Sequence, residues 1–486
     1  MSGAQAMSVP DQTKTPAPKE SSDTSTNTRT WPHYRSVWRW HFYAGLICVP
    51  FVIVLSLTGC VYLFKPQIEA WTERHYDGLQ ISGAVKPPAA QIEAAITAFP
   101  GSQFSSYELP AESTSAARIL VRQKGVVHRT FVHPETLQVL GSIPEDDRIM
   151  RFFFRLHGEL LMGDRGSNIV ETAACWTIVL VLSGLFLWWP RNARGAGGVL
   201  YPHFFNGSKI FWRDLHAVVG MWISFLALFL LLTGLPWAKF WGDYFKQVRR
   251  ITGTAVVQQD WANSSAGKVS GGGTSHEGHG SSGGHGGHGS STSSDSAPAP
   301  DLTAINSMVA TMAALHLEAP VSVSPPGKRS PNWTGKSDTP NRPRRVTVDL
   351  DPKTGEVLSR QNFSDRHWID RAVGFGVAAH EGQLFGWLNV ALGLLTALGL
   401  ILLSVSGIVL WWKRRDQGVL GAPRPIDQPP YSLSFLGIVL FLGLCFPLFA
   451  TTLAAVLLLE WLVLCRIPFA ARWLGLKTAA ATTSIS

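Results

Sequence analysis

Four histidines in this chain occur in two matched patterns that suit metal ligation. His41 and His216 each begin an HxxxG pattern, in "HFYAG" and "HAVVG", at the start of an apolar run. His157 and His380 each begin an HxxxxxG pattern, and each lies 32 residues before the second residue of a Trp-Trp pair. A neutral imidazole is the commonest metal ligand in proteins. The chemistry therefore depends on which elements place these four side chains.

Four apolar stretches are long enough to cross a bilayer, which takes about 20 residues. They are Phe42–Phe64, Val170–Trp189, Ala217–Trp237 and Trp387–Trp412. A fifth stretch, Leu433–Leu464, is interrupted by Pro447 and is long for one span but short for two. We interpret it as one kinked or tilted helix, with a tight hairpin as the alternative.

The composition of the chain favours an integral membrane protein. Of its 486 residues, 46% are hydrophobic, only 15% are charged, and 19 are Trp. The net charge of +9 would suit nucleic acid, but much of the basic charge flanks apolar runs, where membrane topology explains it. We therefore expect a lipid bilayer, and no nucleic acid, as a partner. The five cysteines form no CxxC pattern and predict neither a disulfide framework nor a thiolate metal site.

Basic residues near the span ends predict the orientation. Arg35 and Arg39 precede the first span, "WWPRNAR" ends the second, "KIFWR" precedes the third and "WWKRR" ends the fourth. All these ends share one side, which the positive-inside rule makes the cytoplasm. The N-terminus is then cytoplasmic, and two large segments lie on the outer side.

The predicted organisation is a span–lobe–span unit used twice. The segments are a disordered tail (1–34), the first span (35–65), the first lobe (66–155), the second span (156–190), a cytoplasmic loop (191–212), the third span (213–239), the second lobe (240–370), the fourth span (371–413), a second cytoplasmic loop (414–431), a fifth span or hairpin (432–465) and a C-terminal tail (466–486). Each lobe has a helical stretch and short strands, and "HPETLQVL" and "DPKTGEVL" agree in residue type. The predicted fold class is an α-helical integral membrane bundle with two α+β lobes.

This topology sorts the histidines onto two faces, with one residue from each repeat on each face. His41 and His216 lie near the cytoplasmic side, and His157 and His380 lie near the outer side. Facing imidazoles across a helical bundle are natural axial ligands of a heme iron, so we expect two bis-histidine hemes. His367 is a second candidate for the outer ligand. Nearby arginines that would neutralise heme propionates are Arg39, Arg155, Arg213 and Arg371.

A Gly/Ser/His-rich insert at 264–300 lengthens the second lobe. Its histidines at HxxH spacing are His276, His279, His285 and His288. Loose binding of Cu, Ni or Zn is one interpretation of this spacing, and a solvated linker without metal is the other.

Residues 35–415 resemble the PepSY-associated transmembrane family, also called iron-regulated membrane proteins. The resemblance is carried by "WRWHFYAGL", "RLHGELLMG", "DLHAVVGMW", "HEGQLFGWLN", the span ends "SGLFLWWPR" and "SGIVLWWKRR", and "DPKTGEVL" in the second lobe. It implies that the lobes are PepSY-like and periplasmic. Some members are siderophore reductases of the bacterial inner membrane that carry two b-type hemes.

The resemblance implies a ferric-siderophore or other metal-chelate reductase. Electrons would enter at His41 and His216 from a separate cytoplasmic protein or a quinol, because the chain shows no nucleotide-binding fold. They would leave at His157 and His380, where Fe(III) in a periplasmic chelate would be reduced and released as Fe(II). One competing hypothesis is a membrane-anchored PepSY protein that binds peptides or regulates a protease. Another is a siderophore or metal permease, and a visible absorption spectrum separates both from the heme hypothesis.

Overall fold

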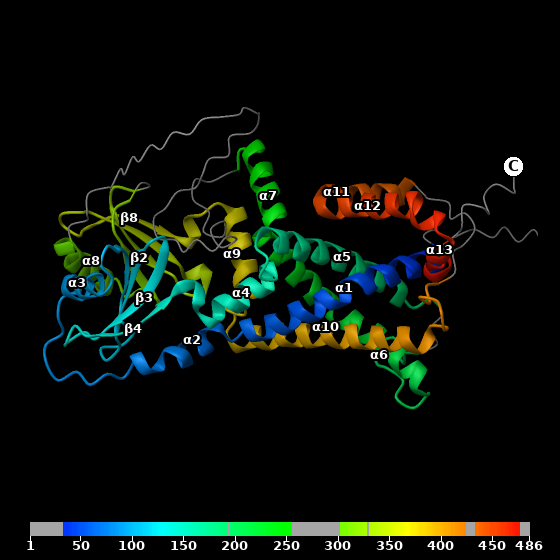
Figure 1. Cartoon of the computed structure of the whole chain (residues 1–486), viewed down its shortest axis with the longest axis horizontal. Helices are drawn as coiled ribbons and strands as arrows, with labels where there is room; N and C mark the ends of the chain where they lie inside the picture. The colour runs from blue at the N-terminus through cyan, green and yellow to red at the C-terminus, as the bar shows by residue number, and fades with distance from the viewer. Residues whose placement is uncertain (1–32, 192–194, 255–301, 328–329, 424–432, 477–486) are drawn as a thin grey trace, which may run out of the picture.

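The computed structural model describes residues 33–191, 195–254, 302–327, 330–423 and 433–476. Nearly all of the expected N-terminal tail and the whole His-rich insert, with His276, His279, His285 and His288, lie outside these residues. Within them, the chain forms a helical bundle with a β-sheet at one end (Figure 1). We call the end of the bundle next to the sheet the sheet-side end, and the other the opposite end.

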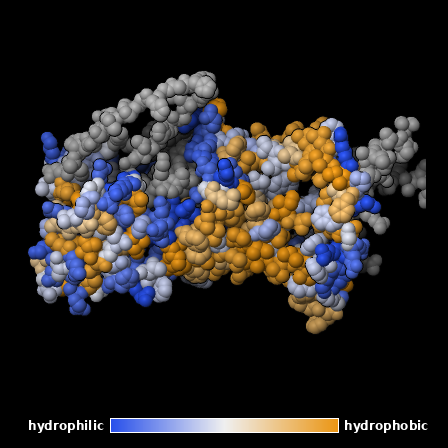
Figure 2. All heavy atoms as spheres, viewed as in Figure 1, coloured by the Kyte–Doolittle hydropathy of each residue, from blue (hydrophilic) through white to orange (hydrophobic). Residues whose placement is uncertain are grey.

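Four long apolar helices build the bundle: α1 (Tyr34–Tyr62), α5 (Asp164–Trp188), α6 (Ser208–Gly234) and α10 (Trp387–Arg414). They form a ring in which α1 packs on α5 and α10, and α6 packs on the same two helices, so α1 and α6 are diagonal. Each is long and apolar enough to cross a membrane, as is the segment Pro447–Arg466. Figure 2 shows the apolar outer surface of the bundle, as expected for a multi-pass membrane protein.

Two short helices at the sheet-side end carry His157 and His380. They are α4 (Ile149–Glu159) and α9 (Trp368–His380), which precede α5 and α10. The expected second and fourth spans, 156–190 and 371–413, thus each combine part of a short helix with a long one. In each half of the chain a turn separates the short helix from the long one. The turn ends at Gly163 in the first half and at Gly386 in the second, and both glycines have φ of +60°. A left-handed conformation of this kind favours glycine, which explains the last residue of the HxxxxxG pattern.

The two expected lobes share one eight-stranded antiparallel sheet. Its strands are β1 (Gln103–Glu108), β2 (Ala117–Gln123), β3 (Val126–Val132), β4 (Val139–Pro144), β5 (Val321–Ser324), β6 (Trp333–Ser337), β7 (Val346–Leu350) and β8 (Val357–Asn362), in the order β4-β3-β2-β1-β5-β6-β7-β8. The halves join where Tyr107 of β1 pairs with Val323 of β5. The expectation of two separate lobes was therefore wrong. Joining β1 to β5 pairs backbone groups that would otherwise be exposed at a strand edge.

One hydrophobic core underlies both halves of the sheet. The helices α3 (Pro88–Ala98) and α8 (Ile305–Ala314) pack on each other as well as on the strands. Ile92 of α3 and Met308 of α8 are fully buried in the same cluster as Trp333. Each half alone has one helix and four short strands, which offer little apolar area to bury. The shared core explains why the halves fold as one body.

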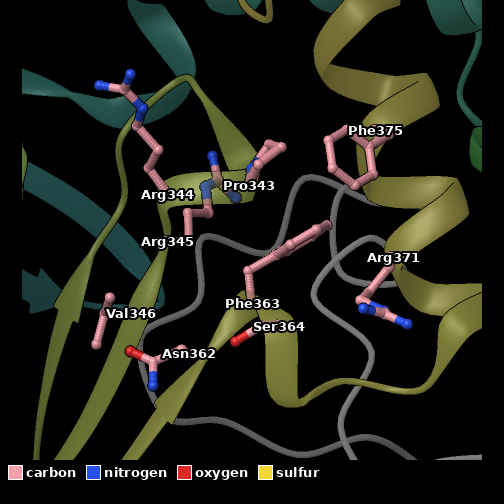
Figure 3. Close-up of a pocket in the computed structure, with 9 residues that line it drawn as sticks. All are labelled: Pro343, Arg344, Arg345, Val346, Asn362, Phe363, Ser364, Arg371 and Phe375. Atoms are coloured by element: carbon pink, nitrogen blue, oxygen red, sulfur yellow. The ribbon is translucent and has the colours of Figure 1, made fainter.

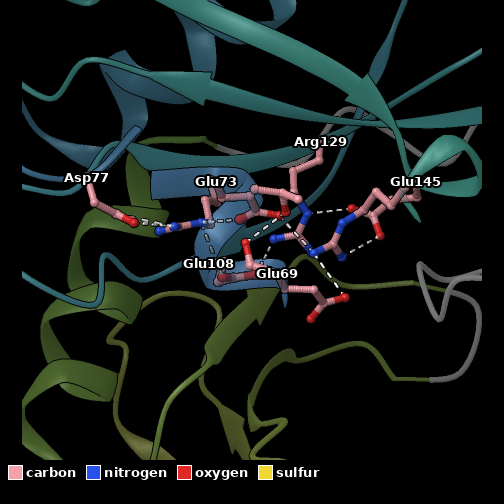
Figure 4. Close-up of polar contacts among 9 residues, drawn as sticks. Glu69, Glu73, Asp77, Glu108, Arg129 and Glu145 are labelled. Carbon is pink, nitrogen blue, oxygen red and sulfur yellow. Dashed lines mark hydrogen bonds and ion pairs between the residues drawn. The ribbon is translucent and has the colours of Figure 1, made fainter. Parts of the chain in front are cut away.

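A buried network of charges fixes α4 to the sheet (Figure 4). Glu73, the last residue of α2 (Lys65–Glu73), accepts from Arg118 of β2 at 3.2 Å and from Arg148 at 2.8 Å. Arg148 directly precedes α4, and it also contacts Glu145 at 3.5 Å. Arg129 of β3 lies 2.5 Å from the same Glu145 carboxylate. The network therefore sets the direction in which α4, and with it His157, leaves the sheet.

The second half of the molecule has a separate buried ion pair. Arg249 of α7 (Lys239–Ile251) contacts Asp370 of α9 through both terminal nitrogens, at 2.6 and 3.0 Å. The Arg249 side chain is only 1% exposed and that of Asp370 is 8% exposed. The pair anchors α9, which carries His380, to a helix outside the bundle.

The C-terminal apolar stretch is a hairpin, and the interpretation as one kinked helix was wrong. The helices α11 (Leu433–Cys445) and α12 (Pro447–Leu462) pack on each other, and the short α13 (Pro468–Leu474) follows. Phe435 stacks on Trp40, and Leu474 accepts from Tyr43, so both ends of the hairpin lie at the opposite end of α1. Its tip meets α7 at the sheet-side end, where Trp241 donates to Cys445. Pro447 breaks the helix because it has no N–H to donate.

Removing one partner of the buried Arg249–Asp370 pair is expected to be costly. Arg249→Met leaves a buried carboxylate without its main partner, and we expect a loss of about 3–5 kcal/mol in unfolding free energy. Arg249→Met combined with Asp370→Leu should recover most of this loss, because neither charge then remains. Thermal unfolding of the purified protein in nanodiscs checks both changes. If the double variant were as unstable as Arg249→Met, the ion pair would not be the source of the effect.

The charge network predicts acid lability of the sheet. Burial alone would raise the pKa of Glu145, but Arg129 and Arg148 outweigh burial and hold that pKa below its ordinary value of 4.5. Glu145 therefore stabilises the fold above about pH 4.5, and this contribution is lost as pH falls through the lowered pKa. Unfolding temperatures measured from pH 7 to pH 3 should fall less steeply in Glu145→Gln than in the wild type. Glu93→Gln, on the exposed face of α3, is the control and should keep the wild-type slope.

Candidate functional site

The four patterned histidines form two facing pairs, one at each end of the bundle. His41 of α1 and His216 of α6 meet at the opposite end, with ring centroids 6.4 Å apart and ring planes at 85°. His157 of α4 and His380 of α9 meet at the sheet-side end, also at 6.4 Å, with planes at 79°. Each pair joins the first half of the chain to the second, as the sequence predicted.

The spacing within each pair fits two imidazoles on opposite sides of one metal ion. A metal–nitrogen bond is about 2.0–2.1 Å long, and a ring nitrogen lies about 1.2 Å from its ring centre, so trans ligands have centroids about 6.4 Å apart. Both pairs have this separation. A direct edge-to-face ring contact also has centroids about 4.5–7 Å apart, so the ligand assignment rests on the anchored Nδ1 atoms as well as on this spacing.

The Nδ1 atom of each histidine hydrogen-bonds a hydroxyl on a neighbouring helix. The four contacts are His41 with Ser183 at 2.9 Å, His157 with Thr58 at 3.0 Å, His216 with Ser406 at 3.0 Å and His380 with Thr233 at 3.1 Å. Each contact stays within one half of the chain. The two halves thus use the same device at corresponding places.

These hydroxyls fix the tautomer of the four histidines. Each hydroxyl also bonds a carbonyl of its own helix, such as Val54 for Thr58 and Leu180 for Ser183. A carbonyl can only accept, so the hydroxyl donates to it and accepts from Nδ1–H of the histidine. His216 has a further acceptor at Nδ1, the carbonyl of Leu403 at 3.1 Å. With the proton on Nδ1, each Nε2 keeps a lone pair for a metal.

A glycine follows each of these hydroxyl residues and lets the imidazole lie against the helix. A Cβ at these glycines would lie 3.3–3.5 Å from Cε1 of the histidine: Gly184 against His41, Gly59 against His157, Gly407 against His216 and Gly234 against His380. A larger side chain would push the ring aside. The imidazole therefore lies close to the helix at the glycine that follows its hydrogen-bond partner.

The donor set suits a planar macrocycle better than a bare metal ion. In the part of the chain that the structure describes, no group of three or more His, Cys, Asp or Glu residues is arranged so that it could hold a metal ion. A structural zinc site needs four protein ligands and a catalytic one needs three. Two imidazoles supply fewer ligands than either kind of zinc site, whereas a porphyrin would bring the remaining ligands with it. The residues of both pairs therefore fit a bis-histidine heme.

The other predicted site residues have varied contacts. Arg39 donates to the carbonyl of Pro423 at 2.7 Å, and Arg213 pairs with Asp214 at 2.6 Å. Arg155 is partly buried on α4, two residues before His157. Arg371 is exposed and lies in a cleft beside the sheet. Their role toward heme propionates stays a prediction for all four.

His367, the second candidate for the outer ligand, caps α9 instead. Its ring accepts from the backbone N–H of Ile369 at 3.3 Å. His367 lies at the start of α9, whereas His380 is the last residue of that helix. Asn389 lies closer to the facing pair and holds the turn between α9 and α10, donating to the carbonyl of Ala379 at 2.7 Å and accepting from Leu384 at 3.1 Å. His380 is therefore the residue that faces His157.

The sequence analysis missed the hydroxyl–glycine dipeptides, although the signal is present. Each of the four long helices contains one such dipeptide, in "LTGC", "LSGL", "LTGL" and "VSGI". Thr58 follows His41 by 17 residues, and Thr233 follows His216 by 17 residues. The glycine of the HxxxG pattern has another role, because Gly45 and Gly220 face leucine side chains of neighbouring helices.

Removing the hydroxyl should loosen its histidine as a ligand. Thr58→Val and Ser183→Ala each take away the acceptor of an Nδ1–H, and outer-shell changes of this kind typically cost 10–100-fold in cofactor affinity. We expect each variant to lose heme to excess apomyoglobin faster than the wild type does. The loss should come only from the pair whose histidine has lost its hydroxyl partner. Thr396→Val is the control, because Thr396 is equally buried in α10 and bonds only its own helix. Equal heme loss in the control and in Thr58→Val would contradict the anchoring role.

Comparison with known proteins finds one family. Curated proteins give no match to the chain. The family model described as the PepSY-associated TM region matches residues 38–414, which include all four facing histidines, all four hydroxyl–glycine dipeptides and both halves of the sheet. Because this match covers most of the chain, the protein belongs to the PepSY-associated transmembrane family.

Proposed function

We propose that this protein is a di-heme electron-transfer protein of the bacterial inner membrane that reduces a ferric siderophore, or another ferric chelate, on its periplasmic side. The observation that carries the proposal is the two facing histidine pairs with their Nδ1 atoms anchored. Each pair has the centroid spacing of trans ligands, and both occur in an otherwise apolar bundle. A structural role alone would not require the same arrangement at both ends.

The chain would hold one b-type heme at each pair. A heme iron with two imidazole ligands supplies a one-electron redox couple when it is bound. The protein orients the ligands through Thr58, Ser183, Thr233 and Ser406, and it excludes water with the apolar side chains of the bundle. The chain would tune the reduction potential of each heme through burial and through the hydrogen bond at Nδ1 of each histidine.

The distance between the pairs matches the thickness of a bilayer. On both α1 and α6, 17 residues separate the histidine of one pair from the threonine that anchors a histidine of the other. At 1.5 Å per residue this is about 25 Å along each helix, close to the roughly 30 Å of the hydrocarbon core. The His41–His216 pair would therefore serve the cytoplasmic side, and the His157–His380 pair the side of the sheet.

The direction of the reaction follows from this placement and from the basic span ends. Electrons would come from a cytoplasmic protein or a membrane quinol and would reach a chelate held by the sheet. One-electron reduction converts Fe(III) to Fe(II), which hard oxygen ligands hold less tightly, so the metal leaves the chelate. The repeated contacts also support the proposal that the two halves arose by internal duplication.

An absorption spectrum with histidine variants tests the proposal. We expect about two b-type hemes per chain by pyridine hemochrome, and a spectrum that shifts on reduction with dithionite. His41→Ala or His216→Ala should each lose one heme, and His157→Ala or His380→Ala the other, because the two facing histidines of each pair would hold one heme together. His128→Ala, which alters a histidine stacked on Phe99 in the sheet, is the control and should keep both.

The reduction itself needs a separate measurement. Dithionite-reduced protein mixed with a ferric siderophore should reoxidise, and a ferrous-specific dye should report Fe(II). A preparation that stays colourless after heme-supplemented expression would rule out the heme proposal. Two hemes without reoxidation by any ferric chelate would leave the electron-transfer role but reject this substrate class.

A further inference from the structure

A basic cleft lies at the junction of the sheet and α9 (Figure 3). It has a volume of about 370 Å³, within the range of small-ligand sites. The turn η5 (Arg342–Arg344), the first residues of β7, the end of β8 and α9 form its walls. The residues that matter to the argument are Arg344, Arg345, Asn362, Phe363, Arg371 and Phe375.

The cleft carries more positive than negative charge. Arg344 forms an ion pair with Glu318, and Arg345 donates to the carbonyl of Thr339 at 2.9 Å. Arg371 is exposed, and no ion pair is found for it among the described residues. Asp365, which follows the lining residue Ser364, accepts from the backbone N–H of Asn362 at 2.9 Å, which lowers its pKa. Among the described residues, three guanidinium groups and no carboxylate line the cleft, which favours an anionic ligand.

Two aromatic side chains also line the cleft, beside the arginines (Figure 3). Phe363 is buried and packs edge-to-face with Phe375, at 5.4 Å between ring centroids and 86° between planes. Phe375 is 46% exposed, so part of its ring is free to contact a ligand. Gly374 allows this packing, because a Cβ there would lie 2.6 Å from the Phe363 ring. The cleft therefore offers guanidinium groups from the η5–β7 segment and from α9, with an aromatic surface beside them.

The cleft is linked to the sheet-side histidine pair. Arg371 precedes His380 by nine residues on α9, about 13 Å along the helix axis. Arg342, in the same turn as Arg344, lies 3.5 Å from the carboxylate of Glu381, the residue after His380. The guanidinium of Arg342 also covers the ring of Trp237 at 5.3 Å. A ligand in the cleft would therefore lie near the end of the bundle that holds His380.

We propose that this cleft binds the chelate as an anion, with Arg371 and Arg345 contacting its oxygen atoms and Phe375 contacting its carbon framework. The inference rests on the proposed reductase function and adds to it the charge and the location of the substrate. Binding in the cleft breaks no bond. An anionic metal chelate has the required chemistry, because oxygen donors carry its charge and organic arms enclose the metal.

The test measures binding without redox chemistry. The heme-loaded protein, in nanodiscs of phosphatidylcholine, is titrated with the gallium(III)–EDTA monoanion by calorimetry, since gallium(III) resists reduction. We expect binding that weakens as salt rises, and at least about a tenfold weaker Kd in Arg371→Gln and in Arg345→Gln. Arg74→Gln, on the other half of the sheet, is the matched control and should bind as the wild type does. Heme content and unfolding temperature confirm that each variant is folded.

Two further arms separate the sources of an anionic ligand. The cationic gallium complex of desferrioxamine B should bind at least about tenfold more weakly than the EDTA complex. Inorganic phosphate at the same concentration should not displace the chelate, and phosphatidylglycerol in the nanodisc should not block it. Displacement by phosphate, or block by the anionic lipid, would make the cleft a phosphate or headgroup site and overturn the proposal.

The result distinguishes this proposal from the proposed function. Unchanged gallium-chelate binding in Arg371→Gln combined with Arg345→Gln would overturn the cleft, even if the protein reduces ferric chelates. Arginine-dependent binding by a protein that reduces no ferric chelate would support the cleft and reject the reductase function instead.

Discussion

The hydrogen bond from a histidine Nδ1–H to a helix hydroxyl is the constraint on which the rest of the structure depends. Four imidazoles sit within or at the ends of an apolar bundle, where an unsatisfied N–H would cost free energy. Each hydroxyl has already given its proton to its own helix, so it accepts from the ring and leaves Nε2 free. The following glycine allows the close approach that this bond needs. Two of these contacts join α1 to α5 and α6 to α10, and the other two join α4 to α1 and α9 to α6.

The sheet helps to position the two histidines that do not lie on long helices. His157 and His380 are carried by short helices, whose directions are set by buried charges rather than by apolar packing alone. The Glu73–Arg148 and Glu145–Arg148 contacts hold α4, and the Arg249–Asp370 pair holds α9. Because β1 and β5 join the halves in one sheet, α4 and α9 share a common support. The facing geometry at the sheet-side end thus depends on contacts well outside the bundle.

Membership of the PepSY-associated transmembrane family agrees with this architecture, and the proposed chemistry follows from the two pairs. Equal centroid spacing at both ends supports the proposal that each pair holds one heme. The pairs lie about 25 Å apart along α1 and α6. The sheet and the basic cleft lie beside only one of them. The two ends of the bundle therefore differ, and we propose that the chelate binds on the side of the His157–His380 pair.

The sequence alone determined the apolar spans, the pairing of the four histidines and the family, because each depends on local composition or on spacing repeated in two places. It did not reveal that Thr58, Ser183, Thr233 and Ser406 anchor the ligands, since a hydroxyl in an apolar helix usually bonds its own backbone. Nor did it show that the lobes merge at β1 and β5, or that the C-terminal stretch folds back as a hairpin. The cleft that contains Arg371 brings together η5, the end of β8 and α9, which are separate segments of the chain. Only the tertiary structure decides such features, because they are contacts between elements whose local sequences carry no record of their partners.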